Sequence, residues 1–257
     1  MNLVKFLVCL FAGLGAGYGT GIAGLSAAAI ITPMLITFLK IDAYEAVGIA
    51  LASDVLASAI SAYTYGKNKN LDVKNGLVML ASVLIFTLVG SFVSSFLPSS
   101  TMGSFAMFMT LFAGLKFILK PVMEAKEGNK NRSKKEAIVQ SILCGMMIGF
   151  VCGFVGAGGG MMMLLVLVSV LGYELKTAVG TSVFIMTFTA LTGAVSHFVI
   201  GGGIPDLWVL SMCIIFTLIG ALFTAKFANK TSPKVMNQAL GFGLVIMSLA
   251  MIIVKYL

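Results

Sequence analysis

Long apolar runs separated by short polar connections make up almost the whole chain. The first run, residues 3–38, would be about 54 Å long as one helix, whereas the hydrocarbon core of a bilayer is about 30 Å thick. The run contains glycine at positions 13, 15, 17, 19, 21 and 24. Because glycine costs about 1 kcal/mol inside a helix, we predict a break in the Gly-rich middle, with short helices at 3–17 and 22–39.

A second Gly-rich run has the same pattern and predicts helices at 137–155 and 158–171. The break falls at the sequence Gly156-Ala157-Gly158-Gly159-Gly160. Backbone that is not helical is stable at membrane depth only where protein or a water-filled cavity covers it, because lipid cannot satisfy its N–H and C=O groups. Each run therefore predicts a hairpin of short helices, and the tip of each hairpin is a candidate site.

Three ordinary membrane spans are predicted after each hairpin. They are 45–65, 75–97 and 101–119 after the first, and 176–199, 206–225 and 235–254 after the second. Four of the five prolines fall at the ends of these spans, where a missing N–H is tolerated, while Pro33 lies within an apolar run and is expected to bend it. The fold class is an all-α polytopic membrane protein.

The two runs are copies of one unit. Adding 132 to the residue number carries Gly13, Gly17, Gly21 and Gly24 onto Gly145, Gly149, Gly153 and Gly156, and Ala46-Val47-Gly48 onto Ala178-Val179-Gly180. A shift of 130 matches Phe86-Thr87-Leu88 with Phe216-Thr217-Leu218, so two residues are missing between the matching blocks. We predict a first transmembrane repeat at 1–119, a basic linker at 120–136 and a second repeat at 137–257.

Composition supports the membrane assignment, since 59% of the residues are hydrophobic and 10% are charged, against about a quarter charged in soluble proteins. The net charge of +8 comes from basic residues between the apolar runs, so nucleic acid is not a predicted partner. The four cysteines lie in apolar runs without a CxxC pair and are interpreted as packing residues. No cofactor and no metal site is predicted, and no nucleophile–base constellation indicates an enzyme.

The basic residues also predict the orientation. Connections 66–74, 120–136 and 226–234 hold three, six and three lysines or arginines, whereas the other connections hold only Lys40 and Lys176. Basic residues gather on the cytoplasmic side, which places these three connections inside and both termini outside. If each hairpin enters and leaves on one side, the repeats are inverted. If each broken segment crosses once, they are parallel, which the charges disfavour.

The tip of the second hairpin is the candidate anion site. Its residues are Gly156, Gly158, Gly159 and Gly160. Backbone N–H groups and the positive end of the helix dipole converge there with no side chain in the way, which suits an anion. The alternative is that glycines only permit close helix packing, and this is the favoured interpretation of the four-residue spacing of Gly145, Gly149 and Gly153.

The matching tip of the first hairpin contains Gly24 and Ser26, whose hydroxyl is a candidate donor. Fewer glycines follow there, so the two halves are not expected to bind in the same way. Thr181 and Ser182 follow the second Ala-Val-Gly block and are candidates to line the cavity opposite the second tip.

Asp54 is the one acid inside an apolar span, and ionisable groups at membrane depth are costly and commonly functional. It is a candidate for coupling to H⁺ or another ion, or else a structural carboxyl bonded to Ser53 or to backbone. His197 is the single histidine and aligns with Tyr65 across the repeat. Its position near a span end favours an interfacial hydrogen-bonding histidine over a proton relay.

With these motifs in view, the sequence resembles the TauE/SafE sulfite exporter family over nearly its whole length. The resemblance rests on Gly17-Tyr18-Gly19-Thr20-Gly21-Ile22-Ala23-Gly24 and on the run from Gly149 to Gly160, each followed by an Ala-Val-Gly block. It implies a membrane transporter with two related halves and a substrate such as sulfite, sulfoacetate or another organosulfur anion. The first motif departs from the family pattern, because Leu25-Ser26-Ala27-Ala28 stands where further glycines are usual.

We therefore expect a secondary transporter of a small anion in the plasma membrane, with alternating access between the two repeats. A passive anion channel would share the glycine tips but would need no titratable residue. An intramembrane redox or enzymatic protein is disfavoured by the lone histidine and the scattered cysteines. The expected partners are the anion, the lipid bilayer and a coupling ion, and the sequence carries no signal for an oligomeric state.

Overall fold

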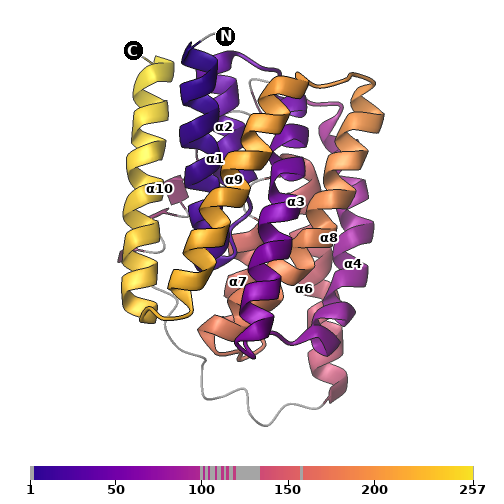
Figure 1. Cartoon of the computed structure of the whole chain (residues 1–257). Coiled ribbons are helices and arrows are strands. Elements are labelled where there is room, and N and C mark those ends of the chain that lie inside the picture. The colour runs from indigo at the N-terminus through magenta and orange to yellow at the C-terminus, as the bar shows by residue number, and fades with distance from the viewer. Residues whose placement is uncertain are drawn as a thin grey trace.

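The computed structural model describes residues 3–98, 134–156 and 159–256, together with single positions between 101 and 119. Every element in this part of the chain is an α-helix, which confirms the predicted class (Figure 1). The helices are α1 (Leu3–Ala23), α2 (Ala28–Leu39), α3 (Ala43–Lys67), α4 (Val73–Ser94), α6 (Lys134–Val155), α7 (Gly159–Ser169), α8 (Leu175–Gly201), α9 (Leu207–Ala228) and α10 (Pro233–Tyr256).

Six of the described helices are long and apolar enough to cross a membrane: α1, α3, α4, α8, α9 and residues Ile138–Val155 of α6. The short apolar helices are α2 and α7. The predicted spans 45–65, 75–97, 176–199, 206–225 and 235–254 correspond to α3, α4, α8, α9 and α10. The predicted span 101–119 lies largely outside the described residues.

The helices stand side by side in one bundle, and α1 begins at the end of the bundle where α10 ends (Figure 1). We call this the terminal end. The α3–α4 and α9–α10 connections lie together at the opposite end, where the Asn70 side-chain amide donates a hydrogen bond to Asn229 Oδ1 over 2.9 Å. The basic connections 66–74 and 226–234 are therefore neighbours.

The main helix pairs join the N-terminal and C-terminal halves of the chain. Helix α1 packs along α9, α6 packs along α4, and α3 packs against α8 in the centre. Under the 132-residue shift α1 corresponds to α6 and α3 to α8, and α4 corresponds to α9. If the two halves are exchanged, the α1–α9 pair corresponds to the α6–α4 pair, and the α3–α8 pair corresponds to itself.

The break in the first apolar run lies at residues 24–27, later than the predicted gap between 17 and 22. Helix α1 continues through its glycines because they form a surface on which α9 lies backbone to backbone. A Cβ atom added to Gly17 would lie 2.7 Å from the backbone nitrogen of Ala221. Thr224 of α9 also donates its hydroxyl to the Gly17 carbonyl over 3.1 Å. Tertiary packing therefore offsets the low helix propensity of glycine here.

The α4–α6 contact is built in the same way. Cβ atoms added to Gly149 and Gly153 would overlap the carbonyl oxygens of Val83 and Thr87, respectively. The second break, between α6 and α7, lies within the predicted residues. In this seam the glycines are packing residues, as their four-residue spacing indicates.

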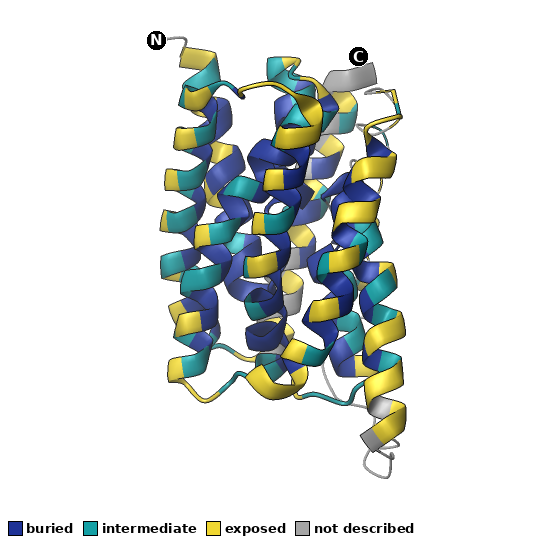
Figure 2. Ribbon diagram, turned by 90° about the vertical axis from the view of Figure 1, so that its right-hand side faces the viewer, coloured by how far each residue is buried: buried dark blue, intermediate teal, exposed yellow. Residues whose placement is uncertain are grey.

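Burial follows the pattern expected of a bundle in lipid (Figure 2). Large apolar side chains point outward, among them Phe11, Phe92 and Phe223, each more than half exposed. The interior instead contains many small and hydroxyl residues, and buried Asp54 is among them. Such small residues allow membrane helices to approach closely.

We expect Gly149→Ala to destabilise the folded protein by about 1–3 kcal/mol, because the added methyl overlaps the Val83 carbonyl across the α4–α6 seam. Gly243→Ala is the matched control, since a Cβ there meets no described atom within 4 Å. Thermal unfolding in detergent compares the two variants. Equal unfolding temperatures for both would show that the seam is looser than the structure indicates.

Candidate functional site

Both breaks are made by a glycine in the left-handed region. Gly24 follows α1 with φ of 64°, and Gly156 follows α6 with φ of 69°. Their N–H groups donate to the carbonyls of Thr20 (3.0 Å) and Cys152 (2.8 Å), which closes the last turn of each helix. A side chain would be strained in this conformation, so these two positions require glycine. They are equivalent under the 132-residue shift.

The two tips lie against each other and against the central helices. A Cβ atom added to Gly160 would overlap the Gly24 carbonyl oxygen and lie 2.6 Å from the Ser26 nitrogen. A Cβ added to Gly156 would lie 2.9 Å from both Ala28 Cβ and Val47 Cγ1. Each break is therefore covered by protein from the other half of the chain, as backbone at membrane depth requires.

Asp54, in the middle of α3, reaches the tip of the first hairpin. It is completely buried. Its Oδ2 accepts the Ala27 N–H over 3.0 Å, at the start of α2, and its Oδ1 accepts the Ser58 hydroxyl over 2.9 Å. The carboxyl group thus occupies the position of an anion at a helix N-terminus, where N–H groups and the dipole favour negative charge.

The same cluster can hold the neutral acid. The Thr20 hydroxyl lies 2.8 Å from the Leu25 carbonyl and 3.2 Å from Asp54 Oδ1. A hydroxyl has one proton and two lone pairs, so Thr20 can donate to the Leu25 carbonyl while it accepts a hydrogen bond from the protonated carboxyl group of Asp54. Within the described part of the chain, Asp54 forms no salt bridge, and the bridge that is found joins Lys5 and Asp206. Since an unpaired buried charge is costly, the neutral form of Asp54 fits this arrangement.

The other predicted site residues are placed as follows. Ser26 lies in the tip and accepts the Ala28 N–H over 3.3 Å. Ser182 donates to the Val179 carbonyl and its hydroxyl lies against Gly24, so it joins the first tip. A Cβ on Gly159 would lie 2.8 Å from Cys152 Sγ, whereas Gly158 lies outside the described residues.

Thr181 is not part of the central group. Its hydroxyl accepts the N–H of Asp72, the residue that caps α4 at the end opposite the termini. Tyr173 donates its hydroxyl to Asp72 Oδ2 over 2.9 Å. Burial opposes ionisation of Asp72, but hydrogen bonds from Asn75 and Tyr173 outweigh it and lower the Asp72 pKa. Burial, followed by the contact with Asp72, raises the pKa of Tyr173.

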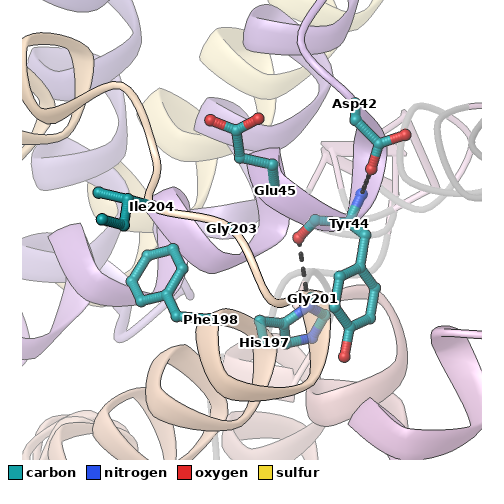
Figure 3. A pocket seen from close by; sticks show the side chains of 8 residues that line it. All are labelled: Asp42, Tyr44, Glu45, His197, Phe198, Gly201, Gly203 and Ile204. Carbon is teal, nitrogen blue, oxygen red and sulfur yellow. Dashed lines mark hydrogen bonds between the residues drawn. The ribbon is translucent and has the colours of Figure 1, made fainter.

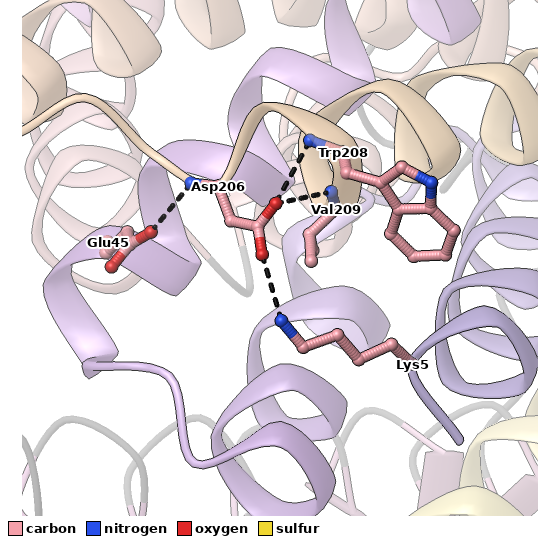
Figure 4. Close-up of polar contacts among 5 residues, drawn as sticks. All are labelled: Lys5, Glu45, Asp206, Trp208 and Val209. Carbon is pink, nitrogen blue, oxygen red and sulfur yellow. Dashed lines mark hydrogen bonds and ion pairs between the residues drawn. The ribbon is translucent and has the colours of Figure 1, made fainter. Parts of the chain in front are cut away.

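A cavity of about 270 Å³ opens at the terminal end of the bundle (Figure 3). Its lining residues are Asp42, Tyr44, Glu45, His197, Phe198, Gly201, Gly203 and Ile204. Asp42 accepts the Tyr44 N–H over 2.9 Å and so caps α3, as its place before the span indicates. From the cavity wall, Glu45 accepts the Asp206 N–H, and Lys5 pairs with the Asp206 carboxylate over 3.1 Å (Figure 4).

His197 lies at the inner side of this cavity and is 2% exposed. It hydrogen-bonds to backbone, as favoured from the sequence, although it is buried between helices and does not face the membrane surface. Its Nε2 lies 2.9 Å from the carbonyl oxygen of Gly153. Tyr65, the aligned residue, donates its hydroxyl to the Gly21 carbonyl over 3.1 Å. Gly21 and Gly153 are themselves aligned, so aligned side chains contact aligned carbonyls.

Sequence reasoning missed Thr20, Ser58 and the role of Tyr65. Ser58 follows Asp54 by one helical turn, and that spacing could have identified it as a hydrogen-bond partner. Thr20 and Tyr65 meet their partners through contacts between helices, for which a single sequence carries no direct signal.

Six membrane-capable helices and buried helix breaks define a multi-pass membrane protein. The sequence profile of one protein family, described as sulfite exporter TauE/SafE, matches residues 9–251 of the chain. The chain belongs to this family. No protein of curated function and no solved structure gives a significant match to it. Among the described residues, no group of three or more His, Cys, Asp or Glu side chains could hold a metal ion.

Proposed function

We propose that this protein is a secondary transporter of a small anion, such as sulfite or an organosulfonate, in the plasma membrane. Membership of a family described as sulfite exporters supports the substrate class. The proposed binding site lies where the two hairpin tips meet, with Gly156, Gly158, Gly159 and Gly160 on one side and Gly24, Ser26 and Ser182 on the other.

The contact between Asp54 and the first tip is the observation that carries the proposal. The carboxyl group of Asp54 caps the N-terminal end of α2 through the Ala27 N–H. Under the 132-residue shift Asp54 corresponds to Met186, whose buried side chain has no charge to offer α7. The first half therefore supplies a carboxyl group to its own half-helix, and we propose that a bound anion takes this place in the second half.

The arrangement of the helices supports inverted repeats with alternating access at their interface. The α1–α9 and α6–α4 pairs exchange with each other when the halves are exchanged. Both termini lie at one end of the bundle, and two basic connections lie at the other. In transporters with inverted repeats, substrate sites form at discontinuous helices near the repeat interface, and half-helix N-termini point at anionic groups.

Charge repulsion links Asp54 to the anion. An ionised carboxylate at the first tip would repel an anion at the neighbouring second tip, because Coulomb energies are large where water is excluded. The neutral acid, which the Thr20 and Ser58 contacts accommodate, removes this repulsion. We therefore propose that a proton on Asp54 and the anion occupy the closed site together. A passive channel would need no such proton.

Flux into proteoliposomes tests the function, with sulfite, sulfoacetate, sulfate and chloride as the panel. We expect a proton gradient to drive sulfite or sulfoacetate flux in the natural protein. The free energy of unfolding of Asp54→Asn should lie within about 1 kcal/mol of that of the natural protein. The amide keeps one oxygen for the Ala27 N–H and can donate to Thr20. Its flux should lose the dependence on the proton gradient. Unchanged dependence would make Asp54 structural, and flux that ignores the gradient in both proteins would favour a channel.

Met186→Asp tests the second tip directly. The new carboxyl group would lie at α7 as that of Asp54 lies at α2, so we expect it to compete with the substrate and weaken anion binding at least tenfold. Met186→Asn is the control with the same shape and no charge. Substrate-induced thermal stabilisation of both purified variants measures the affinity. Equal anion affinity in two folded variants would place the substrate away from this tip.

The proposed orientation puts residues 69 and 230 in the cytoplasm and both termini outside. Single cysteines introduced at these two positions should resist a membrane-impermeant thiol reagent added to intact cells, and both should react after permeabilisation. Labelling of one position from outside while the other stays protected would contradict the shared location of the two connections.

A further inference from the structure

Both ring nitrogens of His197 face groups that can only accept a hydrogen bond. Nε2 lies 2.9 Å from the carbonyl oxygen of Gly153, in α6, and Nδ1 lies 3.2 Å from the carbonyl oxygen of Tyr44, in α3. The ring also lies against the Tyr44 ring, with the centroids 4.1 Å apart (Figure 3). The side chain thus bridges the start of α3 and the end of α6.

A neutral imidazole can donate to only one of these two carbonyls. It carries one N–H and one lone pair, so the other nitrogen directs a lone pair at a carbonyl oxygen. The imidazolium ion donates from both nitrogens, and these two bonds offset part of the cost of burying its charge. We propose that His197 is a proton-binding site, separate from Asp54, whose protonated form ties the start of α3 to the end of α6.

The cavity beside His197 gives the proton a route and a favourable potential. Asp42 and Glu45 line the cavity together with the histidine. Asp206 lies next to Glu45, and its charge is paired with Lys5 (Figure 4). On the α4 side, the group that meets this cluster is the uncharged Ser91, whose carbonyl accepts the Tyr44 hydroxyl. Two carboxylate side chains thus line the same cavity as the histidine, and a negative field favours a bound cation.

The position of Gly153 connects the proton to the second hairpin. Gly153 lies three residues before Gly156, the left-handed residue at which α6 ends. Its carbonyl is among the last four of the helix, which have no donor within the helix itself. A cation at this end also interacts favourably with the helix dipole. Protonated His197 therefore holds the hinge of the second hairpin through Gly153 while keeping its bond to α3, whereas the neutral ring keeps one of the two bonds.

In the first repeat the aligned residue, Tyr65, makes the same kind of contact through a group that does not titrate near neutral pH. The Tyr65 hydroxyl faces the carbonyls of Gly21 (3.1 Å) and Ile22 (3.2 Å), at the end of α1. A phenol stays a donor across the physiological range. The hinge of the first hairpin is thus held at any physiological pH, and the hinge of the second depends on the proton at His197.

The test uses the fact that the chain contains a single histidine. Protein labelled with ¹⁵N-histidine and purified without a histidine tag gives NMR signals from His197 alone. Between pH 4.5 and 8 we expect two protonated ring nitrogens at the acidic end and one tautomer with a single N–H at the alkaline end. A ring that stays neutral over the whole range would overturn the proposal. Because no substrate is present, failure of the transport proposal leaves this result unaffected.

Two variants separate proton binding from a structural role. His197→Tyr copies the first repeat, and we expect flux that no longer responds to acidification on the cavity side but keeps its dependence on Asp54. His197→Gln donates from one nitrogen only, so at every pH it should behave like the protein in which the His197 ring is neutral. Asp54→Asn should leave the histidine titration unchanged. A His197→Tyr protein that folds and keeps the full response to cavity-side pH would contradict the assignment.

Discussion

The fold depends on the need to cover two breaks in the backbone where no water is available. Lipid offers nothing to the free N–H and C=O groups at a helix break, and in this protein the two broken hairpins cover each other. Gly160 lies against the backbone of Gly24 and Ser26, while Gly156 lies against Ala28 and Val47. Because each tip needs the other, neither half of the chain can form its own centre alone. The contact that satisfies the backbone is also the place where the polar groups of the interior collect.

The two halves of the chain have corresponding helices under the 132-residue shift, and they differ in chemistry at single aligned positions. At one pair of aligned positions a carboxyl group, Asp54, stands opposite an apolar Met186. At another a phenol, Tyr65, stands opposite the imidazole of His197. In the second pair the backbone partners are aligned as well, since Tyr65 contacts the Gly21 carbonyl and His197 contacts the Gly153 carbonyl. The proposed functions of the two halves differ accordingly, because they rest on these two pairs of positions.

Much of this architecture could be predicted from the sequence, because lipid makes the length and hydrophobicity of a span follow from bilayer thickness. The described spans and the break after α6 agree with such predictions, and Asp54 is buried within a span as expected, while its functional role stays a prediction. The break after α1 was misplaced, since glycines read as helix breakers are held helical by α9. The contact of Thr20 with Asp54 was not predicted, nor was the separation of Thr181 from Ser182. Both depend on the directions in which side chains point where helices meet. Spacing along one chain does not determine such contacts.

The glycine seams have a mechanical consequence. In the α1–α9 and α4–α6 pairs the backbones touch, so pulling either pair apart would expose carbonyl and amide surface over several turns and leave no side chains to fill the gap. Any motion that keeps a seam intact would therefore carry both of its helices together. Since every seam joins a hairpin of one half of the chain to a span of the other half, such a unit would be built from both halves.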